Sequence, residues 1–164
     1  MAVYLRVSLV RHPVQRPSLI RLAQRILMAV GETKSELSLE LIGDARMRRL
    51  NREYRQQDRV TDVLAFPIRE TVAPQVRTPA TNMLGDVVIS LPTAIRQAQE
   101  AGRSVDDELA TLLVHGVLHL CGYDHERSRQ EAARMSRREQ QVRRMISPVP
   151  RVIMCPHRRK KKVS

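Results

Sequence analysis

The order of hydrophobic and polar residues along the chain predicts a mixture of strands and helices. Alternating or short continuous hydrophobic runs predict strands over residues 3–10, 37–42, 61–66 and 85–90. Hydrophobic residues at helical spacing predict helices over residues 18–30, 44–55, 91–101, 104–121 and 128–146. Because strands and helices do not alternate strictly, the pattern favours an α+β fold with a small mixed β-sheet and about five helices.

Polar residues mark the starts of two of these helices. Asp44 stands where the N-cap of the helix over residues 44–55 is expected. Ser104 and Asp107 form the pattern of a capping box at the start of the helix over residues 104–121. Residues 70–82, in contrast, contain two prolines and no hydrophobic period, so we expect a surface loop there.

The composition fits one domain with an aliphatic core. The chain has 164 residues, of which 42% are hydrophobic and only 2% aromatic. A chain of this length forms one ordinary domain. The scarcity of aromatic residues argues against a module that binds single strands by stacking their bases on aromatic side chains.

The net charge of +12 is concentrated near the C-terminus. Residues 125–164 contain 13 Lys or Arg and 3 acidic residues, which leaves the preceding part nearly neutral. This cationic end predicts a phosphate-rich partner, with nucleic acid favoured over an anionic membrane. Residues 148–164 contain three prolines and a run of five cations. We expect them to form a basic, disordered tail beside a domain over residues 1–147, either solvated or in contact with phosphates.

Cysteine content and hydropathy indicate a cytoplasmic protein. The two cysteines do not suggest a disulfide framework. The N-terminal residues lack the long apolar core of a signal peptide. The longest uncharged apolar stretch, residues 109–123, is too short to span a bilayer. We therefore expect a soluble protein of the cytoplasm that makes no contact with a membrane.

Three histidines within eleven residues are the strongest chemical signal in the sequence. His115 and His119 are four residues apart on a predicted helix, which places both imidazoles on one face. Gly122 can adopt the left-handed conformation that ends a helix, so the chain can reverse and bring His125 to the same point. Three neutral nitrogens with an open fourth position are typical of catalytic zinc. Separate, solvated histidines are the alternative, which this spacing disfavours.

The spacing of these histidines is also that of metzincin proteases. Those enzymes carry a glutamate after the first histidine as general base, and here that position is Gly116. The peptidase interpretation is therefore disfavoured, and a carboxylate would have to come from elsewhere. Asp124 is close in sequence, and it either serves as a cap or orients a histidine. Cys121 falls on another face of the helix, where core packing is expected.

The segment HGVLHLCGYDH, residues 115–125, resembles the signature of the YbeY family of bacterial rRNA-maturation endoribonucleases. The resemblance extends from about residue 3 to about residue 146. Supporting segments occur in the same order as in that family: Leu50-Asn-Arg-Glu-Tyr-Arg55, Thr61-Asp-Val-Leu64, Phe66-Pro67 and Leu84-Gly-Asp-Val-Val-Ile89.

The resemblance implies a single zincin-like α+β domain with one Zn²⁺ per chain, bound by His115, His119 and His125. It implies cleavage of single-stranded RNA in ribosomal RNA maturation, including the 3′ end of small-subunit rRNA, and a part in ribosome quality control. Its implied partners are ribosomal RNA and the small ribosomal subunit, with ribosomal proteins or an assembly GTPase as further candidates.

The resemblance also implies a catalytic role for one arginine. The family's functional arginine follows a Leu-Asn-x-x-aromatic sequence, which matches Arg55 after Tyr54. A guanidinium can hold a phosphate with two hydrogen bonds and offset charge that develops on it. From the residues alone, Arg55 belongs to a run of arginines, and a solvated helix face is the usual explanation of such a run.

The sequence departs from the family pattern at three positions around Arg55. The glycine that usually follows the arginine is Gln56, the proline before Thr-Asp is Val60, and the usual serine before Phe-Pro is Ala65. These departures concern the loop that joins Arg55 to the next predicted strand, and they leave the three histidines unchanged.

Two further functions stay open at this point. A ribosome-assembly factor that uses its metal for structure is favoured by the missing glutamate at position 116. It is disfavoured by the three-ligand set, because structural zinc sites usually have four protein ligands. A metal-dependent hydrolase of another substrate is the second alternative.

Overall fold

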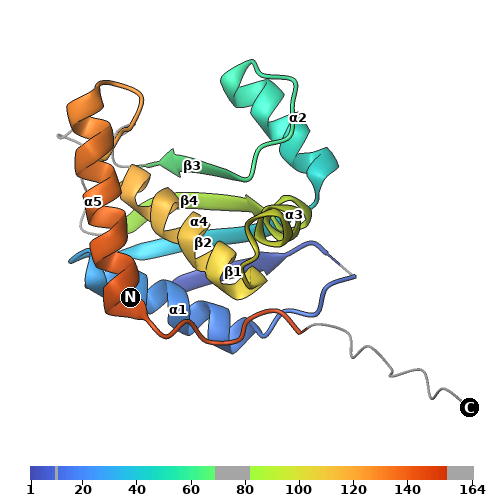
Figure 1. Ribbon diagram of the computed structural model, residues 1–164, viewed down its shortest axis with the longest axis horizontal. Helices are drawn as coiled ribbons and strands as arrows, with labels where there is room; N and C mark the ends of the chain where they lie inside the picture. Colours follow the sequence, from blue (N-terminus) through green and yellow to red (C-terminus); the bar gives the residue numbers. More distant parts are fainter. Residues whose placement is uncertain (10, 69–81, 155–164) are drawn as a thin grey trace, which may run out of the picture.

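The computed structural model describes residues 1–9, 11–68 and 82–154, and within them it contains four strands and five helices (Figure 1). These elements, in chain order, are β1 (Val3–Val7), α1 (Arg16–Ala29), β2 (Glu36–Ile42), α2 (Asp44–Arg55), β3 (Val63–Pro67), β4 (Met83–Ser90), α3 (Leu91–Ala101), α4 (Val105–Leu120) and α5 (Arg129–Ile146). The predicted α+β fold is therefore confirmed. The predicted loop over residues 70–82 lies, except for its last residue, outside the described residues.

The strands form one mixed sheet in the order β1-β2-β4-β3. The pairs β1–β2 and β2–β4 are parallel, whereas β3 runs antiparallel to β4. Within the described residues, β3 and β1 are the two edges of the sheet. The edge at β3 is the one that borders the candidate site described below.

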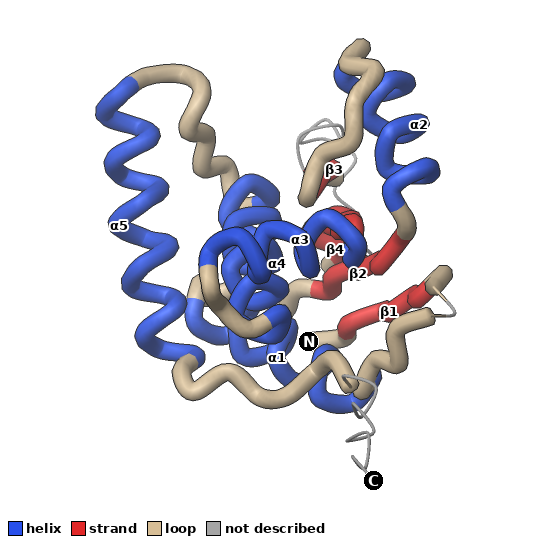
Figure 2. The backbone as a smooth tube through the Cα atoms, turned by 45° about the vertical axis from the view of Figure 1, so that its right-hand side comes forward, coloured by secondary structure: helices blue, strands red, loops and turns tan. Residues whose placement is uncertain are grey.

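The two faces of the sheet carry different helices. In β4, Val87 and Ile89 belong to the main core together with residues of α1, α4 and α5. The intervening Val88 packs on the other face with Met47 of α2 and with Leu64. This alternation separates α2 from α5, and the two helices lie at opposite sides of the molecule (Figure 2).

Helix α4 lies very close to the sheet because it has a glycine at the contact. Gly116 is buried, and a Cβ atom built on it would lie 2.8 Å from Cγ1 of Val87 and 3.4 Å from Cγ2 of Val63. Carbon atoms that are not bonded make their best contacts at about 3.5–4.0 Å. A larger residue at position 116 would therefore push α4 away from β3 and β4.

The start of α2 differs from the prediction for Asp44. The N-cap residue is Gly43, and Asp44 is the first residue of the helix. Its carboxylate accepts hydrogen bonds from the hydroxyls of Ser90 at 2.6 Å and Thr93 at 2.7 Å and pairs with Arg96 at 2.9 Å. The N-cap prediction was wrong because these partners, distant in sequence, bind the carboxylate instead of the helix's own backbone. Asp44 thus ties α2 to the end of β4 and the start of α3.

The first part of the predicted tail packs against the domain. Val152 is fully buried and Ile153 is 5% exposed. Their backbone N–H groups donate to Oδ1 of Asp106 at 2.7 and 2.9 Å, and the N–H of Gln15 donates to the carbonyl of Val152. An extended segment with aliphatic side chains can pair in this way although prolines exclude a helix. Residues 155–164 lie outside the described part of the chain, and their predicted role stays a prediction.

We predict that Asp44→Asn lowers the stability of the fold at pH 7 by about 1.5–3 kcal/mol, the usual contribution of a hydrogen bond to a charged group. Burial raises the pKa of Asp44, but hydrogen bonds from Ser90, Thr93 and Arg96 outweigh burial and hold the pKa below its ordinary value. The ionised form therefore stabilises the fold above the unfolded-state pKa of about 3.9, and this contribution is lost as the pH falls through the lower folded-state pKa.

Denaturant unfolding at pH 7 and at pH 3 measures this difference. The deficit of the Asn variant should shrink at pH 3, and a deficit that is equal at both pH values would contradict the argument. Asp58→Asn is the control, because Asp58 pairs with Arg48 on an exposed surface where ion pairs contribute little.

Candidate active site

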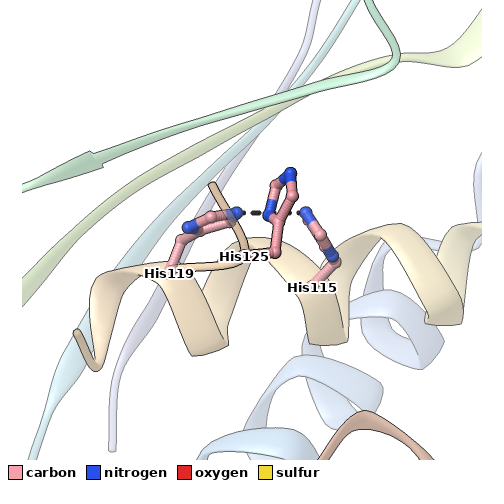
Figure 3. Close-up of side chains that lie close together, drawn as sticks. All are labelled: His115, His119 and His125. Carbon is pink, nitrogen blue, oxygen red and sulfur yellow. Dashed lines mark hydrogen bonds between the residues drawn. The ribbon is translucent and has the colours of Figure 1, made fainter. Parts of the chain in front are cut away.

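Three imidazoles converge at the end of α4 (Figure 3). His115 and His119 come from the helix, and His125 comes from the loop that follows it. The Nε2 atoms of His115 and His119 are 3.1 Å apart, and ligand nitrogens of all three residues lie within 4.8 Å of one another. The predicted convergence of the three histidines is confirmed. Such a cluster can hold a metal ion.

The loop reverses direction at the glycine that the sequence singled out. Helix α4 ends at Leu120, and Gly122 has a φ angle of +94°, which is in the left-handed region. The N–H of Gly122 donates to the carbonyl of His119, and the N–H of Tyr123 donates to that of Leu118. These bonds end the helix tightly and return the chain, so that His125 reaches the other two histidines.

The protonation of His119 suits metal binding. Burial lowers the pKa of His119 below its ordinary value, and the neighbouring His115 and His125 lower it further. His119 is therefore neutral near pH 7, and only a neutral imidazole has a free lone pair for a metal.

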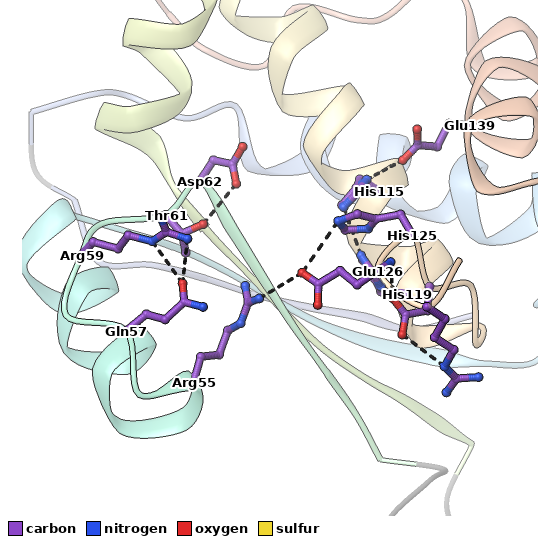
Figure 4. A network of polar contacts seen from close by, with 12 residues as sticks. Arg55, Gln57, Arg59, Thr61, Asp62, His115, His119, His125, Glu126 and Glu139 are labelled. Carbon is purple, nitrogen blue, oxygen red and sulfur yellow. Dashed lines mark hydrogen bonds and ion pairs between the residues drawn. The ribbon is translucent and has the colours of Figure 1, made fainter. Parts of the chain in front are cut away.

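A carboxylate from α5 fixes the orientation of one histidine. Glu139 contacts Nδ1 of His115 and thereby leaves Nε2 of that ring directed at His119 (Figure 4). A carboxylate on the far nitrogen is the usual partner of a metal-binding histidine. Sequence reasoning missed Glu139. The available signal was its position on the buried face of α5, four residues after Met135 and three before Val142.

Asp124, the acidic residue weighed from the sequence, supports the loop. Its carboxylate accepts a hydrogen bond from the N–H of Glu126 at 2.8 Å and pairs with Arg127 at 3.2 Å. The hydrogen bond from Glu126 is the largest contribution that lowers the pKa of Asp124. Cys121 packs against the main core, as expected.

The histidines open into a cleft that Arg55 also lines. The cleft has a volume of about 400 Å³ and is formed by the end of α2, strand β3, the end of α4 and the following loop. Glu126 lies between its two sides, with Oε1 at 3.3 Å from the Arg55 guanidinium and 3.9 Å from Nε2 of His125 (Figure 4). The fold thus brings together Arg55 and the three histidines, although 60 residues separate Arg55 from His115 in the sequence.

The backbone conformation after Arg55 explains why the family pattern has a glycine at the position of Gln56. Gln56 has φ +55° and ψ +31°, a left-handed conformation that favours glycine. The side-chain amide of the buried Asn51 donates to the carbonyl of Arg59 at 2.8 Å and holds the loop beneath the end of α2. A glutamine can occupy this position, at a cost in backbone strain, without displacing Arg55.

An α+β domain with three histidines that converge in a cleft has side chains suited to metal-dependent hydrolysis. No helix among the described residues is both long and apolar enough to cross a membrane. Comparison with known proteins defines the class further. The family model "Endoribonuclease YbeY" matches residues 10–147, and the chain belongs to this family of endoribonucleases, which act in rRNA maturation.

Individual relatives agree with this assignment. A protein from Geobacter metallireducens named endoribonuclease YbeY is 48% identical over 133 residues, which are 80% of this chain and 87% of the relative. One of the same name from Aquifex aeolicus is 39% identical over 141 residues, covering 86% and 90%. The solution structure of a Thermotoga maritima protein aligns with a TM-score of 0.59 at 22% identity over 88% of each chain, and shows the same fold.

We predict that Glu139→Ala weakens the affinity for Zn²⁺ by about 10- to 100-fold, the usual cost of losing the partner of a metal-binding histidine. Competition with a coloured chelator measures the affinity, and circular dichroism shows whether the fold is kept. Glu100→Ala, an exposed glutamate on α3, is the matched control and should bind zinc like the wild type. Equal affinities of both variants would contradict the role of Glu139.

We predict that Gln56→Gly stabilises the fold by about 0.5–1 kcal/mol, because it removes left-handed strain of about 1–2 kcal/mol and adds some unfolded-state entropy. Gln99→Gly, at an exposed position inside α3, should instead lower stability by about 1 kcal/mol. Thermal and denaturant unfolding compare the two. A loss of stability in Gln56→Gly would show that strain at this residue is outweighed by contacts of its side chain.

Proposed function

We propose that the protein is a zinc-dependent endoribonuclease that cleaves single-stranded RNA during ribosomal RNA maturation, including the 3′ end of small-subunit rRNA. The observation that carries the proposal is one cleft lined by three imidazoles that converge closely enough to hold a metal ion and by the side chain of Arg55. Membership of the YbeY family supports the reaction class.

Zinc is the metal proposed for the site. His115, His119 and His125 offer three imidazole nitrogens from a helix and its following loop, a donor set that suits Zn²⁺. A zinc ion held there would act as a Lewis acid on a phosphoryl oxygen of the RNA and would make an attacking water more acidic. Glu139 orients His115 for this task.

Arg55 is proposed as the catalytic residue that binds the scissile phosphate. Its side chain is 40% exposed and pairs with Glu126, whose side chain is 63% exposed. An exposed pair of this kind is weak, so a phosphate that enters the cleft can replace the carboxylate as the partner of Arg55. The planar guanidinium then holds two phosphate oxygens and offsets the negative charge that grows on them during cleavage.

The size of the cleft supports a single-stranded substrate. A volume of about 400 Å³ is that of a small-molecule site. It admits the backbone and base of one flexible nucleotide more readily than a stiff duplex, whose phosphates lie on a wide convex surface. Ribosomal RNA and the small ribosomal subunit are the proposed partners, in the cytoplasm, with ribosomal proteins or an assembly GTPase as further candidates.

We predict that Arg55→Ala keeps the zinc but loses about 10²–10³-fold in the rate of RNA cleavage, the usual cost of removing one charge-stabilising donor. Arg55→Lys should restore only part of the rate, because lysine keeps the charge but not the planar fork. Arg52→Ala removes the same charge from the same helix and should cleave like the wild type. Cleavage of a labelled single-stranded RNA by zinc-loaded protein measures all three.

His115→Ala is the control for the enzyme itself. It should lose zinc and cleavage together. Equal cleavage by wild type and His115→Ala would indicate a contaminating nuclease and leave a non-catalytic assembly factor with a structural metal as the function. Accumulation of precursor small-subunit rRNA in cells that lack the protein tests the proposed substrate.

A further inference from the structure

A second groove runs along α5, next to the cleft that holds the histidines. It has a volume of about 640 Å³. Its lining residues are almost all long and polar: Tyr123, Arg134, Arg137, Arg138, Gln140, Gln141, Arg144 and Met145. Tyr123 lines both the groove and the cleft, so the two are adjacent at this side chain.

The arginines share one face of α5 because of their spacing. Arg134 precedes Arg137 by three residues and Arg138 by four, and Arg144 follows Arg137 by seven. These spacings place the four side chains along one side of the helix. The opposite face carries the buried side chains of α5 and faces the core. The stripe is therefore a consequence of the amphipathic pattern, and the side chains of Arg134, Arg137 and Arg144 are exposed to solvent.

These charges are not neutralised by the protein. Across residues 1–9, 11–68 and 82–154, no carboxylate forms an ion pair with any of the four arginines. The guanidinium of Arg134 lies 5.2 Å from the ring centre of Tyr123, which holds it at the junction with the cleft. Arg138 donates to the carbonyl of Ala29 at 3.2 Å and so also ties α5 to α1.

The chemistry and length of the groove fit a chain of phosphates. Arg134 and Arg144 are ten residues apart, which corresponds to about 15 Å along the helix. This length exceeds a single phosphate and matches a backbone of a few nucleotides. Guanidinium groups on a solvent-exposed stripe bind phosphate oxygens well, and four of the eight side chains that line the groove are arginines.

We propose that this groove binds the sugar-phosphate backbone of the RNA strand where it leaves the cleft, and so extends the binding site beyond the cleaved bond. This inference rests on the proposed function, because it assigns the groove to the same substrate. In this proposal the arginines of the groove contact phosphates and not bases. The groove therefore increases the affinity for longer strands without sequence specificity.

The experiment compares two triple variants of the full chain. Arg134→Gln, Arg137→Gln and Arg144→Gln together remove the groove charge and leave Arg138 to hold α1. Arg6→Gln, Arg21→Gln and Arg25→Gln remove the same charge from exposed positions outside the groove. Each protein binds a fluorescent single-stranded DNA of about 20 nucleotides, which carries the same phosphate charge per nucleotide as RNA, at several salt concentrations.

The groove variant should bind more weakly, with a salt slope shallower by about 0.7 for each lost phosphate contact, or about 2 in total. The control variant should keep the slope of the wild type. In cleavage assays, the groove variant should process a tetranucleotide RNA like the wild type, and its KM should rise only for a strand of about 20 nucleotides.

Three outcomes separate the possibilities. Equal salt slopes for the groove variant and the wild type would overturn the inference. Weaker binding of a polyglutamate peptide together with unchanged DNA binding would also overturn it, and would indicate an acidic protein partner. A wild-type protein that binds DNA through the groove but cleaves no RNA would instead overturn the proposed function and leave the groove assignment intact.

Discussion

The close contact between α4 and the sheet at Gly116 is the constraint on which the site depends. Without a Cβ atom at this position, the helix lies directly on Val87 and Val63, and its two histidines are directed at the edge formed by β3. The same contact excludes a glutamate after His115, where metzincin proteases have their general base. The chain therefore has to supply its charged groups from other elements, and it does so from α2, α5 and the loop after α4.

Each of these elements is held by a polar contact of its own. Asp44 ties α2 to the end of β4, Glu139 joins α5 to His115, and Asp124 accepts a hydrogen bond from the backbone of Glu126 in the loop after α4. Such contacts restrict the motion of side chains that have to meet within a few ångströms. The exposed pair of Arg55 and Glu126 is different, since both groups face the cleft and can exchange partners.

The parts of the structure that could be predicted are those that depend on neighbouring residues in the sequence. The helix periodicity, the four-residue spacing of His115 and His119 and the left-handed turn at Gly122 are local properties, and the structure confirms them. The role of Glu139 depends on which helix lies beside α4, and helical periodicity shows a buried face without showing its partner. Asp44 was assigned to its own helix for the same reason.

The C-terminal segment shows a second limit of sequence patterns. Pro148 and Pro150 suggest a linker, yet Val152 and Ile153 are buried, because a strand-like segment can pair with residues 13–15 and with the carboxylate of Asp106. Prolines exclude a helix but not an extended chain with free N–H groups at the following positions. The sequence pattern therefore predicted the end of the last helix correctly. It did not predict that the following residues, up to Ile153, pack against the domain.

The position of α5 in the fold gives the concentration of basic residues near the C-terminus a structural explanation. A cationic segment at the end of a nearly neutral chain could serve any phosphate-rich partner, and sequence alone does not relate it to the histidines. In the fold, α5 lies beside α4 with Glu139 turned inward to His115 and its arginines turned outward along the groove. One helix thus contacts the histidine cluster with one face and carries arginines without carboxylate partners among the described residues on the other, and Tyr123 borders both surfaces. A positively charged groove next to a cleft raises the local concentration of a polyanion there, so this arrangement would let the cationic helix and the histidines act on the same molecule.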